Sequence, residues 1–468
     1  MIAAERKKRK WSLNDLQACY QSAYSIVPWE RGRRSIVSRF YHRIFTPWVT
    51  VWCLIYQRLS ADHRCEAVVS YLKSGAVDEM EHQAGRAPLS QRLKSESTAS
   101  YCQARRRLPL AVLHDGVWRS GEIVHASGGP GALWQGRDVY LLDGSTILLR
   151  PAPELVAHYG IHRTQKKESY WVLLQTVVAF CLGTGAVRFG SEGTERQSEQ
   201  HLAMDILARS EPGNVYVADR AFGIFSVVQA ALHYGADVVV RLSRPRASKL
   251  YSRQLYPGCD HLVAWAPSRK DKLLVTPQSR EPITGRLIYV RLEHPGYRSQ
   301  DLYLFTTLLD RDTFSRRALV ELYAKRWHVE LDLRYLKAEL DMHLLTVKSV
   351  DMVRKELFAG FIAYNLVRGF MVQAARQSGS SPLTLSFANC WRRVRDAVFH
   401  LAPDAEERGR QWEGLLQSLS RCRLVRRSQS RFEPRQKHYP PKTYPELRGS
   451  RTEARRRSIR RRLALAAC

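Results

Sequence analysis

Apolar positions in the first quarter of the chain recur every three to four residues, which is the spacing of amphipathic helices. Three segments show this pattern: residues 12–27, 46–60 and 61–75. Thr46 followed by Pro47 is a typical helix start, with a capping hydroxyl before a proline at the first helical position. We therefore predict a helical N-terminal domain over residues 1–110.

The pattern changes at residue 138, where short β-prone runs begin. Residues 138–149 hold two apolar runs separated by Asp143, Gly144 and Ser145. This segment is either a β-hairpin with Asp-Gly at its tip or a strand that ends at Asp143. In the second case the carboxylate would lie at an open edge of a sheet, where functional groups often gather.

Strands and helices then alternate up to residue 242. The expected order is a strand at 170–182, a helix at 199–209, a strand from 214 that runs into Asp219 and Arg220, a helix at 223–234 and a strand at 236–242. This alternation is typical of an α/β layer. Asp219 is either a functional carboxylate at a strand end or the N-cap of the helix that follows.

A β-rich stretch separates this layer from the helices that follow. Four runs alternate like antiparallel strands, at residues 261–267, 272–277, 286–293 and 301–308. They predict a β-rich insertion over about residues 245–310. Residues 353–377 then form a strongly apolar helix, but Asn365 and Arg368 interrupt it, which disfavours a membrane span.

The stretch Tyr323 to Lys337 (YAKRWHVELDLRYLK) has neither proline nor glycine and is predicted to be one continuous helix. At about 100° per residue, four of its polar residues project from one face within an arc of about 60°. These are Tyr323, Arg326, Glu330 and Lys337. A solvated helix with ordinary ion pairs is one interpretation. The other is a carboxylate that presents a metal-binding oxygen to a phosphate, with cations beside it.

Charge narrows the choice of partner. The 468 residues include 74 Lys and Arg against 44 Asp and Glu, a formal net charge of +30, which favours a polyanion. Nucleic acid is favoured over a membrane because no stretch offers about 18 uninterrupted apolar residues. Arg105, Arg106 and Arg107 are predicted DNA contacts, so the helical domain at residues 1–110 is predicted to bind DNA. Residues 379–468 are predicted to form a helical, basic and partly disordered tail. Nine cysteines without a CxxC pair, and no apolar segment after the basic N-terminus, favour the cytoplasm.

Three motifs occur in a fixed order along the chain. They are Asp143-Gly144-Ser145, Asp219-Arg220-Ala221-Phe222 and the spacing Y-x2-R-x3-E-x6-K from Tyr323 to Lys337. This combination resembles the signature of the IS4 family of insertion-sequence transposases. The resemblance implies a ribonuclease H-like core at residues 111–378, with a mixed sheet, flanking helices and the β-rich insertion, in an α/β fold that is α+β overall. It also implies a DDE triad of Asp143, Asp219 and Glu330.

The resemblance further implies cut-and-paste DNA transposition, with a hairpin at the transposon end and then strand transfer. Carboxylates without a His or Cys ligand motif prefer a hard cation, so we expect two Mg²⁺ ions, with Mn²⁺ as a substitute. Tyr323, Arg326, Lys337 and Arg220 would contact phosphates of double-stranded DNA. Pairing of two transposon ends would need at least a homodimer.

Two other functions remain open from the sequence alone. One is a nuclease of the same fold that cuts DNA without joining it, and the other is a transposase-derived DNA-binding protein without catalysis. The presence of all three carboxylates counts against the second. Transposition would place the protein in the bacterial cytoplasm, at the nucleoid.

Overall fold

The computed structural model describes most of the chain. Described residues are 44–78, 87–161, 171–269, 271, 280–292, 300–399, 405–424, 450, 452–453, 455–456 and 459–460. The predicted helix at 12–27 and the predicted strand at 272–277 lie outside them.

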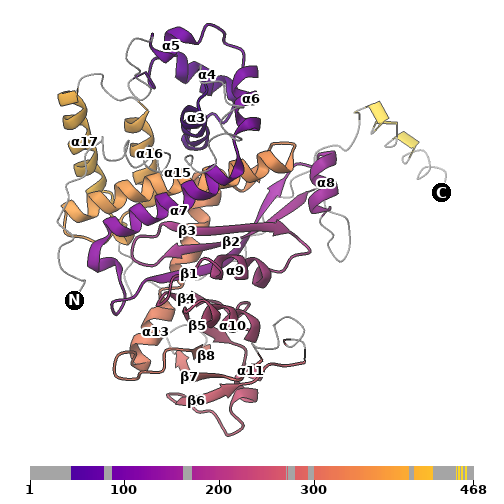
Figure 1. The fold of residues 1–468 in the computed structure, drawn as a ribbon, viewed down its shortest axis with the longest axis vertical. Helices are drawn as coiled ribbons and strands as arrows, with labels where there is room; N and C mark the ends of the chain where they lie inside the picture. The colour runs from indigo at the N-terminus through magenta and orange to yellow at the C-terminus, as the bar shows by residue number, and fades with distance from the viewer. Residues whose placement is uncertain are drawn as a thin grey trace, which may run out of the picture.

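One mixed β-sheet forms the centre of the fold (Figure 1). Its strands lie in the order β3 (Val187–Thr194), β2 (Val172–Cys181), β1 (Val139–Leu149), β4 (Val215–Ala218), β5 (Asp237–Leu242), β8 (Gln300–Thr306), β7 (Ile283–Leu292) and β6 (Asp260–Trp265). β1, β2 and β3 pair antiparallel, whereas β1, β4 and β5 pair parallel. This is the expected ribonuclease H-like arrangement, so the predicted fold class is confirmed.

The segment around Asp143 is one uninterrupted strand. β1 continues past Asp143 to Leu149, and β2 pairs with it throughout, with Asp143 opposite Val178 and Gly144 opposite Val177. Both predictions for this segment, the hairpin and the strand that ends at Asp143, are therefore wrong. Pairing with β2 keeps the Asp-Gly step extended, and the local pattern carries no information about that partner.

Helices cover both faces of the sheet (Figure 1). One layer contains α7 (Leu110–Ser127) and α15 (Val350–Gln377), and the other contains α9 (Glu199–Leu207) and α10 (Phe225–His233). Along β1, Leu141 packs in the core of the α15 layer and Leu142 in that of the α9 layer. Because side chains alternate along a strand, Asp143 faces the α15 layer and Gly144 faces the α9 layer.

α15 is the one helix in the described part of the chain that is long and apolar enough to span a membrane, yet most of its apolar window is buried inside the protein. Asn365, which interrupts the apolar run, donates from Nδ2 to the carbonyl oxygen of Val187 at 2.8 Å and to Oγ of Ser120 at 3.0 Å. Its Oδ1 accepts from the backbone N–H of Val187 at 2.8 Å. The polar side chain therefore joins α15 to β3 and α7 as part of a packed core.

The N-terminal helices pack on the far side of α15. They are α3 (Pro47–Leu59), α4 (Cys65–Lys73), α5 (Leu89–Arg92) and α6 (Ala99–Arg107). The predicted helices at 46–60 and 61–75 are confirmed, and Oγ1 of Thr46 caps α3 by accepting from the backbone N–H of Val49 at 3.2 Å. One apolar core runs from these helices through α15 to α16 (Phe387–Val398) and α17 (Ala405–Ser420). The core does not divide at residue 110, although α7 begins there.

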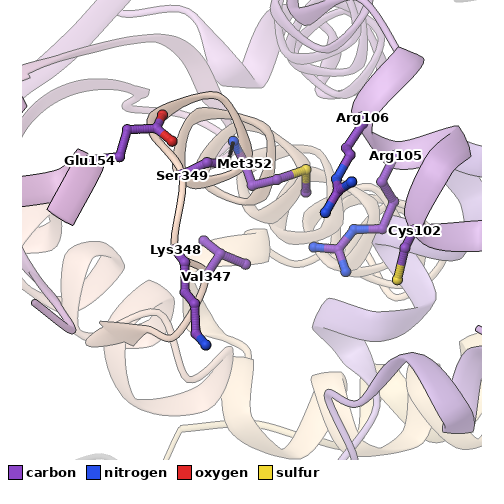
Figure 2. Close-up of a pocket in the computed structure, with 8 residues that line it drawn as sticks. All are labelled: Cys102, Arg105, Arg106, Glu154, Val347, Lys348, Ser349 and Met352. Carbon is purple, nitrogen blue, oxygen red and sulfur yellow. Dashed lines mark hydrogen bonds between the residues drawn. The ribbon is translucent and has the colours of Figure 1, made fainter. Parts of the chain in front are cut away.

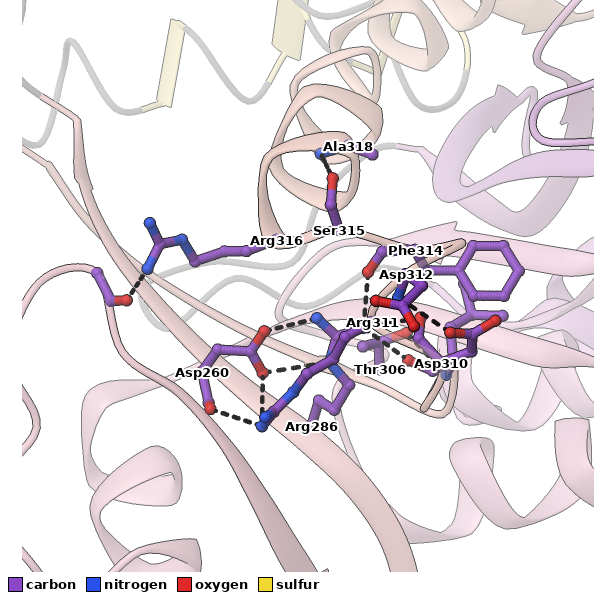
Figure 3. Close-up of polar contacts among 12 residues, drawn as sticks. Asp260, Arg286, Thr306, Asp310, Arg311, Asp312, Phe314, Ser315, Arg316 and Ala318 are labelled. Carbon is purple, nitrogen blue, oxygen red and sulfur yellow. Dashed lines mark hydrogen bonds and ion pairs between the residues drawn. The ribbon is translucent and has the colours of Figure 1, made fainter.

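The β-rich insertion extends the main sheet, because β8 pairs antiparallel with β5 and is followed outward by β7 and β6. Arg286 on β7 is fully buried. Its guanidinium forms an ion pair with Asp260 on β6 at 2.5 Å and donates to the carbonyl oxygen of Phe314 at 2.7 Å (Figure 3). Phe314 leads into α13 (Arg316–Ala324), so the insertion supports the helix that carries Tyr323.

Candidate active site

Asp143 and Asp219 lie side by side where a parallel strand ends. Leu142 on β1 pairs with Ala218, the last residue of β4. The residue that follows each of these two in the chain is an aspartate. Asp219 is not a helix N-cap, because α10 begins only at Phe225. Its Oδ1 instead accepts from the backbone N–H of Ala221 at 2.7 Å, which holds the turn after β4.

Arg326 links the third carboxylate to the first. Its Nη2 lies 2.8 Å from Oε1 of Glu330, and its Nη1 lies 3.6 Å from Oδ2 of Asp143. Asp143 and Arg326 are mostly buried, whereas Glu330 is partly exposed. The structure therefore brings all three predicted carboxylates to one region, where the guanidinium of Arg326 joins Asp143 to Glu330 and Asp219 lies beside Asp143.

The helix that carries Glu330 is not continuous, contrary to the prediction. α13 ends at Ala324, Lys325 and Arg326 form a turn, and α14 spans Trp327–Arg334. The backbone N–H of Arg326 donates to the carbonyl of Tyr323 at 2.9 Å, a tighter i to i−3 bond. A π-helical turn follows at Tyr335–Glu339.

These irregular turns change which residues share a face. Tyr323 is buried, near Arg326, and burial raises the pKa of its phenol. Lys337 lies on the π-helical turn and is half-buried, which lowers its pKa. Tyr323, Arg326 and Glu330 therefore lie near one another, whereas no ion pair joins Lys337 to the three carboxylates in the described part of the chain.

The other predicted DNA contacts differ in their exposure. Arg220 is exposed in the turn after β4. Arg106 and Arg107 are exposed at the end of α6. Arg105 is buried, and its guanidinium forms an ion pair with Glu356 on α15 at 2.6 Å, so the prediction that it contacts DNA is wrong. Arg105 lies on the inner face of an amphipathic helix. Its position next to two exposed arginines in the sequence does not reveal this.

Like charges are concentrated at this site. The pKa of Asp143 is raised to about 6, mainly by burial and also by the neighbouring Asp219 and Glu199, against the opposing effects of the Gly144 backbone N–H and Arg326. Glu199 is the first residue of α9, and its nearness to Asp143 is not predicted from the sequence. Glu199 belongs to the helical layer on the face of the sheet opposite to α15. In the sequence, only the glycine at position 144 hints that the carboxylate of Glu199 lies close to β1.

The acids suit a divalent metal by their chemistry. Their donors are carboxylate oxygens, which hard cations such as Mg²⁺ prefer. Arg326 forms ion pairs with two of them, Asp143 and Glu330. No three acidic, His or Cys side chains of the described residues are grouped so that they could hold a metal ion, and Glu330 is turned toward Arg326. Asp143, Asp219 and Glu330 would hold the metal once Glu330 leaves that ion pair.

The raised pKa of Asp143 predicts a pH dependence. The native state binds the proton more tightly than the unfolded chain, whose value is near 3.8, so ionisation of Asp143 destabilises the fold above about pH 6, and this cost disappears below about pH 4. Metal binding requires the ionised form. We expect Mn²⁺ affinity, measured by calorimetry, to fall about tenfold for each pH unit below 6. An unchanged affinity at pH 5 would contradict this.

Comparison with known proteins adds the family. Residues 134–366 match the model described as "Transposase DDE domain". The chain is 25% identical over 292 residues to transposase InsG for insertion sequence element IS4 of Escherichia coli (strain K12), covering 61% of this chain and 64% of the relative. It is 30% identical over 114 residues to a probable transposase for IS5377 of Geobacillus stearothermophilus, covering 24% and 28%. The chain thus spans less than two thirds of either relative.

Among solved structures, the chain is similar to the piggyBac transposase in a synaptic complex with hairpin DNA. The TM-score is 0.36 at 13% identity, over 86% of this chain and 84% of that one, a likeness too distant to carry an argument. The family match includes Asp143, Asp219 and Glu330, and the relative from E. coli is an IS4 transposase. The chain therefore carries a region that matches the transposase DDE domain and is similar to an IS4 transposase.

Proposed function

We propose that the protein is a DNA transposase that excises and inserts an insertion sequence by metal-dependent phosphoryl transfer. The observation that carries this proposal is the position of Asp143 beside Asp219 at the end of β4, with Glu330 joined to Asp143 through Arg326. Carboxylates from distant parts of the chain meet near the carboxyl end of β4, and a phosphoryl-transfer site requires such a meeting of carboxylates.

Asp143, Asp219 and Glu330 would hold two Mg²⁺ ions, for which Mn²⁺ could substitute. When bound, such ions activate the attacking water or 3′-hydroxyl and stabilise the oxygen that leaves. Asp143 lies between the other two acids and would contact both ions. Tyr323 and Arg326 would contact the phosphate at the transposon end, and Lys337 and Arg220 the phosphates on either side.

Arg326 has to change partners in this proposal. In the structure its guanidinium is bound by Glu330 and Asp143, whereas in the complex it would bind a phosphate. Arg326→Ala is expected to weaken binding of the transposon end about tenfold while Mn²⁺ affinity stays equal or rises, since a competing cation is lost. Titrations of end DNA and of Mn²⁺ test this. A large loss of Mn²⁺ affinity would show that Arg326 assembles the metal site.

A second DNA contact is proposed at a pocket of about 540 Å³ between α6 and the start of α15. Arg106 and Lys348 line it, together with Ser349, the N-cap of α15, and Glu154 (Figure 2). Arg105 also lines the pocket, but its guanidinium is held by Glu356. Lys348 lies shortly after β9 (Leu344–Leu345), which pairs with the end of β1. The pocket thus lies beyond the same strand that carries Asp143, where DNA leaving the active site could pass.

Replacing both Arg106 and Lys348 by alanine is expected to weaken DNA binding about tenfold or more and to reduce the salt slope of log K by about two, one for each lost phosphate contact. Fluorescence anisotropy at several salt concentrations measures both. Arg209→Ala, an exposed arginine at the end of α9, serves as the control and should behave like wild type. An unchanged slope in the double variant would exclude a phosphate contact at this pocket.

We further propose a hairpin at the transposon end, strand transfer into target DNA, a homodimer that pairs two ends, and action at the bacterial nucleoid. Incubation of the full chain with Mg²⁺ and DNA carrying the element's ends tests the activity. Excision and joining are expected. Cutting without joining would indicate a nuclease, and binding alone would indicate a protein that has lost catalysis.

A further inference from the structure

Two thiols lie against each other beside the pocket between α6 and α15. Sγ of Cys65, the first residue of α4, lies 3.9 Å from Sγ of Cys102 on α6. Both side chains are partly exposed, and neither cysteine is in a disulfide. Two cysteines that are 37 positions apart in the chain therefore meet as a pair of free thiols.

Cys102 opens onto the pocket of about 540 Å³. It lines one side of this pocket next to Arg105 and Arg106 (Figure 2). Among the described residues that line the pocket, Cys102 is the one cysteine. A small reagent that enters the pocket therefore meets the sulfur atom of Cys102.

A fixed cation lies against the second sulfur atom. Nη1 of Arg105 donates to Sγ of Cys65 at 3.1 Å, and Nη2 of the same guanidinium donates to Glu356 on α15 at 2.6 Å. Burial raises the pKa of the Cys65 thiol, and Arg105 opposes this rise. A guanidinium next to a thiol stabilises the thiolate, which is the form that attacks another sulfur atom. Cys65 is therefore well placed to react with a sulfur atom that is already activated at Cys102.

We propose that Cys65 and Cys102 form a reversible thiol–disulfide site that reacts with low-molecular-weight disulfides. The thiolate of Cys102 attacks one sulfur atom of the small disulfide, which breaks the S–S bond, forms a mixed disulfide and releases one thiolate. The thiolate of Cys65 then attacks the sulfur of Cys102 and releases the second. The two cysteines lose two electrons and two protons, and the small disulfide takes up both and leaves as two thiols. An excess of small thiol reverses the reaction, as in other redox-sensing pairs of the cytosol.

The geometry requires only a small movement for the second step. The sulfur atoms of a disulfide are about 2 Å apart, so the two side chains must approach by roughly 2 Å. α6 is anchored, because Nζ of Lys355 on α15 donates to the carbonyl oxygens of Arg105 at 3.0 Å and Arg106 at 2.9 Å. Cys65 is at the start of α4, where a helix adjusts more easily than in its interior. The movement is therefore expected at Cys65.

Peptide mapping of the full-length protein tests the proposal. The reduced protein is incubated with oxidised glutathione, the remaining thiols are alkylated, and the digest is analysed without reductant. A linked pair of peptides that contain Cys65 and Cys102 is expected, and dithiothreitol should remove the link. Cys390 and Cys422 also interact with each other, but both are buried, so they should stay reduced and serve as the internal control. Absence of the link in protein that carries glutathione at Cys102 would overturn the proposal.

Serine variants separate the two steps of the reaction. Cys65→Ser keeps an acceptor for Arg105 and is expected to accumulate a stable mixed disulfide at Cys102, whereas the wild type passes through this species only transiently. Cys102→Ser is expected to lose the link and to carry little glutathione at Cys65. Equal and rapid modification of Cys65 in Cys102→Ser would contradict the assigned order of attack.

Bound DNA should protect the pair. Arg106 and Lys348, for which a phosphate contact is proposed, line the same pocket as Cys102. Saturating end DNA is therefore expected to slow formation of the link about tenfold or more, because the reagent loses its access. This last expectation rests on the proposed DNA contact, and its failure is distinguishable. If the link forms equally fast with DNA, the contact at the pocket is wrong and the disulfide stands. If no link forms in the free protein, the disulfide is wrong and the DNA contact is unaffected.

Discussion

Replacement of Asp143, Asp219 or Glu330 by alanine is expected to abolish cleavage and joining of DNA while leaving DNA affinity within a few fold of wild type. Catalysis of phosphoryl transfer depends on positioned charges, so each loss should lower the rate about a thousandfold or more. DNA affinity depends mainly on contacts between cations and phosphates, and none of the three substitutions removes a cation. Gel-based cleavage assays and anisotropy titrations on the same end DNA measure the two quantities.

A matched control is available on an element next to the site. Asp205→Ala on α9 removes an exposed carboxylate that contacts Ser191 and should retain wild-type rates. Equal losses of binding and cleavage in the three triad variants would instead show that these residues maintain the fold. Substantial cleavage by any one of them would remove it from the proposed triad.

Arg368→Leu is expected to destabilise the protein by about 3–5 kcal/mol, because it leaves a buried carboxylate without its partner. Arg368 on α15 is almost fully buried and forms an ion pair with Asp332, two residues after Glu330 on α14. Tyr364 donates to the same carboxylate at 3.0 Å and accepts from Nε of Arg368 at 2.8 Å. This network fixes the helix of Glu330 on α15. Urea denaturation measures the change in the free energy of unfolding.

The double variant Asp332→Leu with Arg368→Leu separates charge from packing. Replacing both partners by apolar residues should recover most of the lost stability, because no unpaired charge remains. Arg376→Leu, an exposed position near the end of the same helix, should change stability by less than about 1 kcal/mol. If the double variant is as unstable as Arg368→Leu, volume and shape rather than charge determine the loss.

Sequence alone predicted the elements that depend on local pattern. The strand before Asp219 was predicted because a short apolar run is followed abruptly by a charged pair, and α9 and α15 were predicted because their apolar periodicity is strong. The juxtaposition of Asp143 and Asp219 was implied by the family resemblance, whereas the course of β1 beyond Asp143 was not predicted. Such features need only the residues within the element or its nearest parallel neighbour.

Features set by tertiary contacts were not predicted. The break at Lys325 and Arg326 occurs in a sequence with no helix-breaking residue, where an ideal helix would have kept the four polar residues on one face. Arg105 looked like part of a cationic patch, but Glu356, some 250 residues later, holds it in the core. Glu199 was read only as the start of a helix, because its nearness to Gly144 depends on the packing of α9 against β1.

Iron-mediated backbone cleavage tests the central claim most directly. Fe²⁺ can replace Mg²⁺ at oxygen-ligand sites, and with ascorbate and peroxide it cuts the polypeptide near its ligands. The account predicts cuts close to Asp143, Asp219 and Glu330 in the same protein, all suppressed by excess Mg²⁺ and all lost in Asp143→Ala. Cuts confined to one of these segments, or cuts elsewhere that Mg²⁺ does not suppress, would contradict a metal site shared by the three carboxylates.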